Sequence, residues 1–319
     1  MQSAVSYSQN ESHSFSRFLF VWSGQLISNI GSGLMQMAES SKYIISPLIA
    51  GFLLKIMDIK ELLVLDTLTF LIAIFSVLGV KINSTVISRE QSNPHFFHDL
   101  REGFNYLFNN HAILLLISII SFITFFIGLL QALLGPMILS LAEAQTFGII
   151  QAVATAGMLI GSCFIGIFGK FKKKIPILTI SLIMCGIFFS LLGLSPNLIA
   201  ITSFGFLFFL ILPFVNTCLD VLVRSNVENY IQGRIWSMVS LISQLGMVIA
   251  FGMAGYLADA IFNPLLQPHG FLTTSVGTVI GVGAGRGIGL MFVMSGLFVA
   301  MTAIVIGRLK LLRDLEISS

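Results

Sequence analysis

The sequence predicts an all-α fold, a polytopic bundle of membrane-spanning helices. Of its 319 residues, 56% are hydrophobic and only 10% are charged, whereas soluble domains contain about 25% charged residues. So few charges could not cover a water-facing surface, but lipid accepts apolar residues on the outside of a protein as well as inside it. Long apolar runs and a regular alternation of basic connections predict the same class.

Seven apolar runs are candidates for membrane spans, because a bilayer core requires roughly 20 apolar residues per helix. In chain order they are Leu62–Val80, Ala112–Leu134, Phe147–Phe168, Ile177–Leu194, Leu198–Leu219, Ser237–Leu257 and Ile288–Ile306. The third run contains Gly157 and Gly161, a small-xxx-small pair of the kind that lets two helices approach closely. We therefore expect this run to pack tightly against a neighbouring helix.

Basic residues gather in every second connection between these runs. Twelve of them lie there: Lys81, Arg89, Arg101, Lys170, Lys172, Lys173, Lys174, Arg224, Arg234, Arg308, Lys310 and Arg313. The alternate connections contain only Lys55, Lys60 and Arg286. By the positive-inside rule, the basic connections and the C-terminus are predicted to be cytoplasmic.

Residues 91–110 are predicted to form an amphipathic helix rather than a span. Phenylalanine and leucine side chains recur on one side at helical spacing, and Asp99, Arg101 and Glu102 occupy the other side. This pattern is typical of a helix that lies at the membrane interface. His95 and His98 could form a metal site on this helix, but histidines three residues apart on a surface helix are more commonly solvated, so we expect no metal.

The sequence does not indicate an enzyme or a nucleotide-binding protein. It contains no P-loop, His-Glu-x-x-His or Gly-x-Ser-x-Gly pattern, and all five histidines lie outside the spans or at their edges. The glycine-rich residues 281–289 do not spell a dinucleotide fingerprint and follow no predicted strand. We therefore expect no enzymatic activity, no cofactor and no nucleic-acid partner.

Five short segments fall on the loops and helix ends of this topology in a recognisable order. They are HDLREGFNY (98–106), GIFGKFKKK (166–174), QGRIWS (232–237), GYLAD (255–259) and GAGRGIG (283–289). With six spans after a cytoplasmic linker, they resemble the C-terminal half of the major facilitator superfamily, in its drug- and macrolide-efflux and enterobactin-exporter-like branch. The resemblance implies that residues 112–319 form a six-helix half with a short tail and that residues 81–111 form the linker. It also marks a set of cytoplasmic loop residues: Gly166, Gly169, Lys170, Lys172, Lys173, Lys174, Gly233 and Arg234.

Residues 1–80 depart from the family's pattern. Residues 18–33 resemble the opening of helix 1, residues 36–54 resemble helix 5, and Leu62–Val80 resembles helix 6, so most of helices 1–4 are missing. The Gly-x-x-x-Asp-Arg-x-Gly-Arg signature of the loop between helices 2 and 3 does not occur in the sequence. We therefore expect a truncated N-terminal half in residues 1–80 and about 8–9 apolar helices in all.

Polar residues inside the spans are the natural markers of a transport pathway. Gln131, Asn216 and Gln244 are candidates for lining it, although hydrogen bonding between helices would explain them equally well. Asp220 and Arg224 are four residues apart on one predicted helix, so they face each other. We favour a gating or structural ion pair for these two residues over a proton relay.

The resemblance implies an efflux-type secondary transporter, an antiporter of small molecules such as drugs or siderophores, driven by protons across a bacterial-type plasma (inner) membrane. Its expected partners are the lipid bilayer, the small-molecule substrate and protons. The alternative is an internally deleted, non-transporting remnant that acts at most as a membrane interaction partner. A homodimer or another membrane protein would then cover the faces left by the missing helices.

Overall fold

The computed structural model describes residues 53, 56–79, 96–168, 173–228, 231–268, 270–310 and 312. Every regular element in this part of the chain is a helix, which confirms the predicted fold class. In chain order the helices are α2 (Ile59–Gly79), α3 (Phe96–Asn109), α4 (His111–Leu139), α5 (Ala144–Phe168), α6 (Lys174–Leu194), α7 (Leu198–Asn226), α8 (Gln232–Tyr256), η1 (Leu257–Phe262), α9 (Asn263–Leu266), α10 (Gly277–Ile280) and α11 (Arg286–Arg308).

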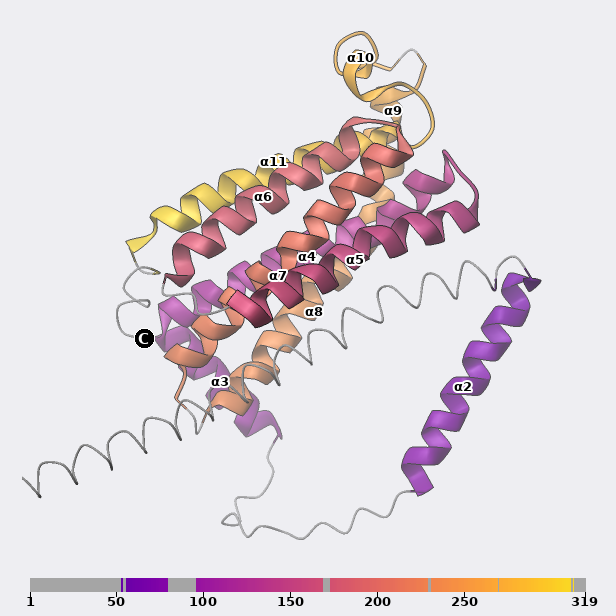
Figure 1. Cartoon of the computed structure of the whole chain (residues 1–319). Coiled ribbons are helices and arrows are strands. Elements are labelled where there is room, and N and C mark those ends of the chain that lie inside the picture. The colour runs from indigo at the N-terminus through magenta and orange to yellow at the C-terminus, as the bar shows by residue number, and fades with distance from the viewer. Residues whose placement is uncertain are drawn as a thin grey trace, which may run out of the picture.

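Six of the seven predicted spans are helices long and apolar enough to cross a membrane, namely α4, α5, α6, α7, α8 with its continuation, and α11. The seventh, predicted at Leu62–Val80, is present as α2, whose apolar stretch covers Leu63–Ile72. Helix α2 lies apart from the six-helix bundle (Figure 1), and its described side chains are exposed. The other helices predicted before residue 53 lie outside the described residues.

The six long helices run alternately in opposite directions and give the bundle two distinct ends. At one end α4, α6 and α8 begin and α5, α7 and α11 finish, and the described basic residues there are Lys173, Lys174, Arg224, Arg234, Arg308 and Lys310. We call this the basic end. At the other, the loop end, α9 and α10 and the residues around them cap the bundle (Figure 1).

The long helices are joined in pairs by glycines at which the backbones approach closely. A side-chain carbon added to Gly157 would meet the carbonyl oxygen of Phe206, and one added to Gly161 would lie 3.3 Å from Cγ of Pro213. These contacts bring α5 against α7, as the small-xxx-small pair predicted. Small residues at such positions are what allows helices in a membrane to pack closely.

Helices α4 and α8 approach in the same way. A side-chain carbon on Gly128 would lie 2.8 Å from Cβ of Ala250, and one on Gly246 would lie 2.8 Å from the carbonyl oxygen of Ser121. The hydroxyl of Ser121 also donates a hydrogen bond of 3.1 Å to the carbonyl oxygen of Ile242. Serine hydroxyls commonly hydrogen-bond across helices at such interfaces in membrane proteins.

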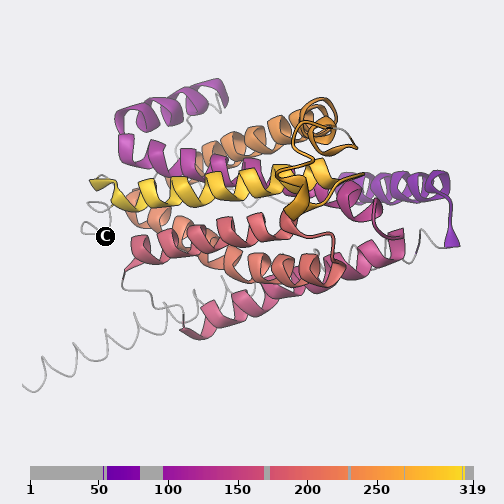
Figure 2. The ribbon, with the colours of Figure 1, turned by 90° about the horizontal axis from the view of Figure 1, so that it is seen from above.

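The third close pair is α6 with α11, which lie side by side along most of their length (Figures 1 and 2). Gly186 of α6 faces Gly296 of α11, and Gly193 of α6 faces Gly289 of α11. Between the two pairs, the hydroxyl of Ser190 donates a 3.0 Å hydrogen bond to the carbonyl oxygen of Val293. The seven-residue spacing of the glycines on each helix keeps them on one face for two turns.

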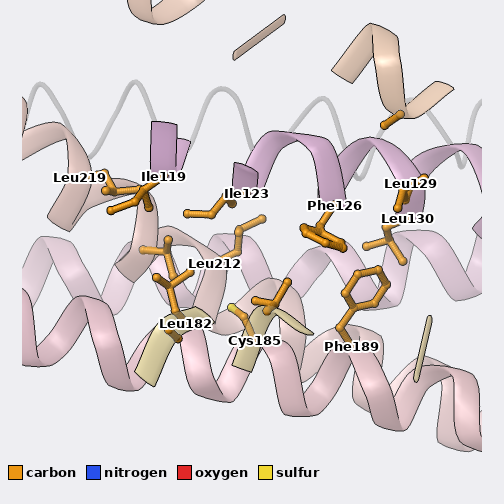
Figure 3. Close-up of a cluster of buried hydrophobic side chains, with 14 of the residues drawn as sticks. Ile119, Ile123, Phe126, Leu129, Leu130, Leu182, Cys185, Phe189, Leu212 and Leu219 are labelled. Atoms are coloured by element: carbon orange, nitrogen blue, oxygen red, sulfur yellow. The ribbon is translucent and has the colours of Figure 1, made fainter. Parts of the chain in front are cut away.

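The centre of the bundle is an apolar core, of which Figure 3 labels side chains from α4, α6 and α7; buried residues of α8 and α11 also belong to it. The ring centroid of Phe189 lies 5.2 Å from that of Phe292 and 5.7 Å from that of Phe208. Beside these rings, a cavity of about 20 Å³ is lined by apolar side chains and Cys185. A void of this size holds about one water molecule, and its apolar walls give a water no partners.

Helix α3 confirms the predicted amphipathic helix over residues 96–109; the predicted residues 91–95 lie outside the described part of the chain. Leu107 is 1% exposed and belongs to the main core, whereas Phe108 is 62% exposed. Gly103 lies against Met238 of α8, where an added side-chain carbon would be 3.3 Å from Cγ. The helix is therefore anchored to the basic end of the bundle by one face.

Helix α8 continues beyond its predicted end through the π-helix η1 and then α9, as one helical stretch from Gln232 to Leu266. π-Helical turns are rare in proteins, and those that occur often lie at functional sites. The chain then returns to α11 through residues 267–285. Gly281, Gly283 and Gly285 in this return have positive φ angles of 95°, 122° and 75°, a region that glycine enters without steric cost.

Candidate functional site

The ends of α7 and α8 meet at the basic end of the bundle around Arg224. Its guanidinium carbon lies 5.5 Å from the ring centroid of Trp236, over the indole. The side-chain nitrogen Nε2 of Gln232 donates a 3.2 Å hydrogen bond to the backbone carbonyl of Arg224. These two contacts tie the last turn of α7 to the first turn of α8.

Asp220 lies one turn before Arg224 on α7, as the sequence predicted, and is half-buried while Arg224 is exposed. Residues four apart on a helix are neighbours on its surface. Asp220 is also the only carboxylate within α4, α5, α6, α7, α8 and α11, all of whose residues lie in the described part of the chain. The ion pair between the two side chains stays a prediction.

The three predicted pathway residues lie on three helices, of which α4 contacts both α7 and α8. Gln131 on α4 and Gln244 on α8 are exposed, and Asn216 on α7 is half-buried. At about 1.5 Å per residue, Asn216 lies roughly 15 Å and Gln244 roughly 18 Å from the basic ends of their helices, whereas Gln131 lies roughly 30 Å along α4. Asn216 and Gln244 therefore share a depth near the middle of the bundle, and Gln131 lies towards the loop end.

The apolar cavity in the core is not a binding site for a drug-sized molecule. Its volume of about 20 Å³ is far below the roughly 300–1,000 Å³ of typical small-molecule sites. None of the three predicted pathway residues lines it; its walls include Phe126, Leu182, Cys185, Phe189 and Leu212 (Figure 3).

The predicted loop-motif residues all fall at the basic end where the structure describes them. Lys173 is the exposed N-cap of α6, and the half-buried Lys174 is its first residue. Gly166 and Gly233 are exposed with open space beside them, and Arg234 is half-buried. Gly169, Lys170 and Lys172 lie outside the described residues.

Two features of the charged residues were not predicted from the sequence. Trp236 appears in the QGRIWS segment, but its contact with Arg224 depends on how the end of α7 meets the start of α8. Arg286 was noted only as an isolated basic residue, yet it is 3% exposed at the start of α11. The signal for it was its position beside three glycines, which indicates a close approach of the backbone.

A model of the Major Facilitator Superfamily matches residues 28–251, more than half of the chain. Macrolide efflux protein A from Streptococcus pyogenes is 27% identical over 248 residues, which are 72% of this chain and 58% of the relative. Macrolide efflux protein A from Enterococcus faecalis is 27% identical over 236 residues, 68% of this chain and 69% of that protein. The chain thus spans less than two thirds of the streptococcal relative's length. No solved structure matches it.

Proposed function

This chain belongs to the major facilitator superfamily, and from that membership we propose that it acts as a secondary transporter that exports small molecules. The observation that carries this proposal is the match of the family model over residues 28–251, which includes four of the six long helices of the bundle and most of α8. The macrolide efflux proteins among its relatives favour a drug, and specifically a macrolide, as the substrate over a siderophore.

In this proposal residues 112–319 are the C-terminal half of the transporter, residues 81–111 are the linker, and residues 1–80 are a shortened N-terminal half. Transporters of this kind bind their substrate near the middle of the membrane between two halves that rock about it. The polar side chains proposed to meet the substrate at that depth are Asn216 on α7 and Gln244 on α8. Their amide groups can donate and accept hydrogen bonds, which suits a substrate rich in hydroxyl and carbonyl groups.

The proposed orientation in the plasma (inner) membrane places the basic end and the C-terminus in the cytoplasm. The described cations of the six-helix bundle support it, since Arg286 alone lies at the loop end. Cytoplasmic loops of membrane proteins carry an excess of lysine and arginine.

Proton coupling is the proposed source of energy for export. If protons are coupled within this half, Asp220 is the carboxylate that would carry them, because it is the only one in the six long helices. Its half-buried position beside Arg224 also suits an ion pair that opens and closes at the cytoplasmic end. Neutralising Asp220 would then remove both the gate and the coupling group.

The experiment is macrolide efflux from cells that express this chain, compared with empty cells and with a version carrying helices 1–4 of a relative. Efflux by the chain as it stands, abolished by a protonophore, is the expected result for an active antiporter. Efflux only after helices 1–4 are restored would overturn the activity of this chain and retain the family's activity for its C-terminal half.

The second candidate is a non-transporting remnant that associates with another membrane protein or with a second copy of itself. It is favoured by the outward apolar faces of α5 and α8. Ile149 and Ile160 on α5 are 50% and 42% exposed, and Val248 on α8 is 64% exposed. Lipid covers such faces as well, so the mass of the purified particle in a lipid disc separates a monomer from a dimer.

A further inference from the structure

Arg286 is the one charged side chain that is buried among the described residues. It is the first residue of α11 and lies 3% exposed beneath the return from α9. It is also the only lysine or arginine at the loop end in the described bundle, residues 111–310. A buried cation is costly unless an opposite charge or several hydrogen bonds compensate for it.

One edge of the Arg286 guanidinium has a partner and the other has none. Nη1 donates a 3.3 Å hydrogen bond to the carbonyl oxygen of Ile280. Nε and Nη2 are buried, and neither has a hydrogen-bond partner among the described residues. These two nitrogens form the side of the guanidinium that binds two oxygens of a carboxylate or phosphate in parallel.

The helix end adds to the positive field at this edge. The N-terminus of a helix carries a partial positive charge and favours anions, and Arg286 begins a helix of 23 residues. A cation at that position is unfavourable by itself, since the two positive charges repel each other. A bound anion would compensate for both.

The two acidic residues at the loop end do not supply this anion. Asp259 and Glu143 are exposed, and Oδ1 of Asp259 accepts a 3.0 Å hydrogen bond from Nδ2 of Asn263. The other side-chain atom of that amide, Oδ1 of Asn263, is buried and has no partner in the described part of the chain. It lies against Gly287, the residue next to Arg286.

The unpartnered acceptor and the unpartnered donors thus belong to the same junction of α9 and α11, where Asn263 packs against Gly287, the residue after Arg286. Asn263 Oδ1 can only accept a hydrogen bond, whereas Nε and Nη2 of arginine can only donate. A fully ionised oxyanion would satisfy the arginine but not the asparagine. A phosphate group that keeps one proton has unprotonated oxygens, which accept hydrogen bonds, and one hydroxyl, which donates a hydrogen bond.

A short glycine-rich turn, residues 281–285, covers the side chain of Arg286. Gly281 lies on the side-chain stem, where an added carbon would be 3.1 Å from Cδ of Arg286. The cover is joined to α9 by a hydrogen bond of 3.0 Å from the backbone nitrogen of Gly283 to the carbonyl oxygen of Leu266. Its three glycines adopt positive φ angles that other residues rarely adopt. Because Nε and Nη2 are buried, a ligand would have to displace this turn to reach them.

We propose that Arg286 and Asn263 form a binding site for a phosphate-class oxyanion at the loop end of the bundle. Nε and Nη2 of Arg286 bind two phosphate oxygens, and Asn263 Oδ1 accepts the hydrogen bond of the remaining hydroxyl. The ligand is free phosphate or the phosphomonoester headgroup of an anionic lipid. The site is independent of the efflux proposed above, since it requires neither a second half nor a substrate.

The test uses the purified full chain in detergent and measures its thermal unfolding midpoint in phosphate, sulfate and chloride at equal ionic strength. A ligand that binds the folded state alone raises the midpoint with its concentration. We expect phosphate to stabilise the wild-type protein more than sulfate, which has no proton to donate at neutral pH. Chloride is expected to have no specific effect.

Variants assign that stabilisation to the two side chains. Arg286→Lys keeps the charge but loses the bidentate edge, so the apparent Kd for phosphate is expected to rise at least about tenfold. Asn263→Leu is expected to abolish the preference for phosphate over sulfate while sulfate still binds. Arg308→Gln, an exposed cation at the basic end, is the control and is expected to change neither value.

Lipid discs separate the two sources of the phosphate group. Stabilisation by phosphatidic acid over phosphatidylcholine, lost in Arg286→Lys, assigns the site to a lipid headgroup, and stabilisation by free phosphate alone assigns it to the soluble ion. Equal response of wild type and Arg286→Lys to every probe overturns the proposal. The proposal is also overturned if Asp259→Asn and Arg286→Gln destabilise the protein equally and the double variant is no less stable than either one. Asp259 would then be the ionic partner of Arg286.

Discussion

The backbone of Gly193 in α6 lies against that of Gly289 in α11, so that a side-chain carbon on Gly289 would be 2.6 Å from the carbonyl oxygen of Gly193. The same arrangement recurs at Gly186 and Gly296, where the corresponding distance from Gly186 is 2.6 Å. Real side chains essentially never approach so closely, so either helix would have to shift to accept one. The α6–α11 pair therefore depends on glycine at these positions.

Gly289→Val is expected to lower the unfolding free energy by about 1–3 kcal/mol, because an overpacked contact forces the backbones apart. The measurement is thermal unfolding of the purified protein in detergent. Gly252→Ala in α8 is the matched control, since nothing lies within 4 Å of the carbon that it adds. This control should be neutral or slightly stabilising, as alanine favours helix over glycine. Equal destabilisation by both changes would contradict a specific contact.

The helices could be predicted from the sequence because the membrane imposes a length and a composition on each span. The predicted run Phe147–Phe168 became Ala144–Phe168, and Ile288–Ile306 became Arg286–Arg308. The small-xxx-small pair of Gly157 and Gly161 also kept its predicted role. Such features are local, so the residues themselves contain the information.

Which glycines would face one another could not be predicted, because the contact of Gly193 with Gly289 joins residues 96 positions apart in the sequence. The π-helix η1 was missed for a related reason, since no composition distinguishes it from an α-helical turn. Of the predicted site, Asn216 and Gln244 share a depth in the bundle while Gln131 does not. That difference arises from the direction and offset of each helix rather than from the residue type.

Trp236→Leu is expected to destabilise the junction of α7 and α8 by about 0.5–1 kcal/mol, the value of a cation–π contact at an exposed site. Trp236→Phe should retain part of that energy, because a phenyl ring still offers a negative face to Arg224. The measurement is a double-mutant cycle of unfolding free energies with Arg224→Gln. Additive effects of the two changes would show that the 5.5 Å approach contributes no energy.

Neutralising Asp220 alone should harm stability more than neutralising both Asp220 and Arg224, because Asp220→Asn leaves a cation without its partner. The expected coupling is roughly 0.5–1 kcal/mol for a partly exposed pair. Unfolding of Asp220→Asn, Arg224→Gln and the double variant gives this value directly. Equal losses of unfolding free energy in Asp220→Asn and in the double variant would argue against an ion pair. The role of proton carrier would then remain for Asp220.

Replacing Lys172, Lys173 and Lys174 with glutamate should disturb the orientation of the neighbouring spans, because it removes the densest cluster of cytoplasmic charge. Labelling of single cysteines in the loops of intact cells reports which side each loop occupies. Lys55→Glu with Lys60→Glu is the control, since those lysines lie in the alternate connections. Unchanged accessibility of every loop in the triple variant would refute the proposed effect of this lysine cluster on the topology.

Gln244→Leu is expected to reduce macrolide efflux about tenfold, because a hydrogen bond to a bound substrate is worth about 1–1.5 kcal/mol. Its unfolding midpoint should not change, as Gln244 is exposed on α8 and leucine favours a helix at least as well. The measurement is efflux by whichever form of the chain is active, with the amount of protein in the membrane held equal. Val248→Leu, one turn along the same exposed face, is the control and should transport normally. If Gln244→Leu also transports normally, Gln244 does not line the pathway, and the amide group of Asn216 at the same depth becomes the next candidate to replace.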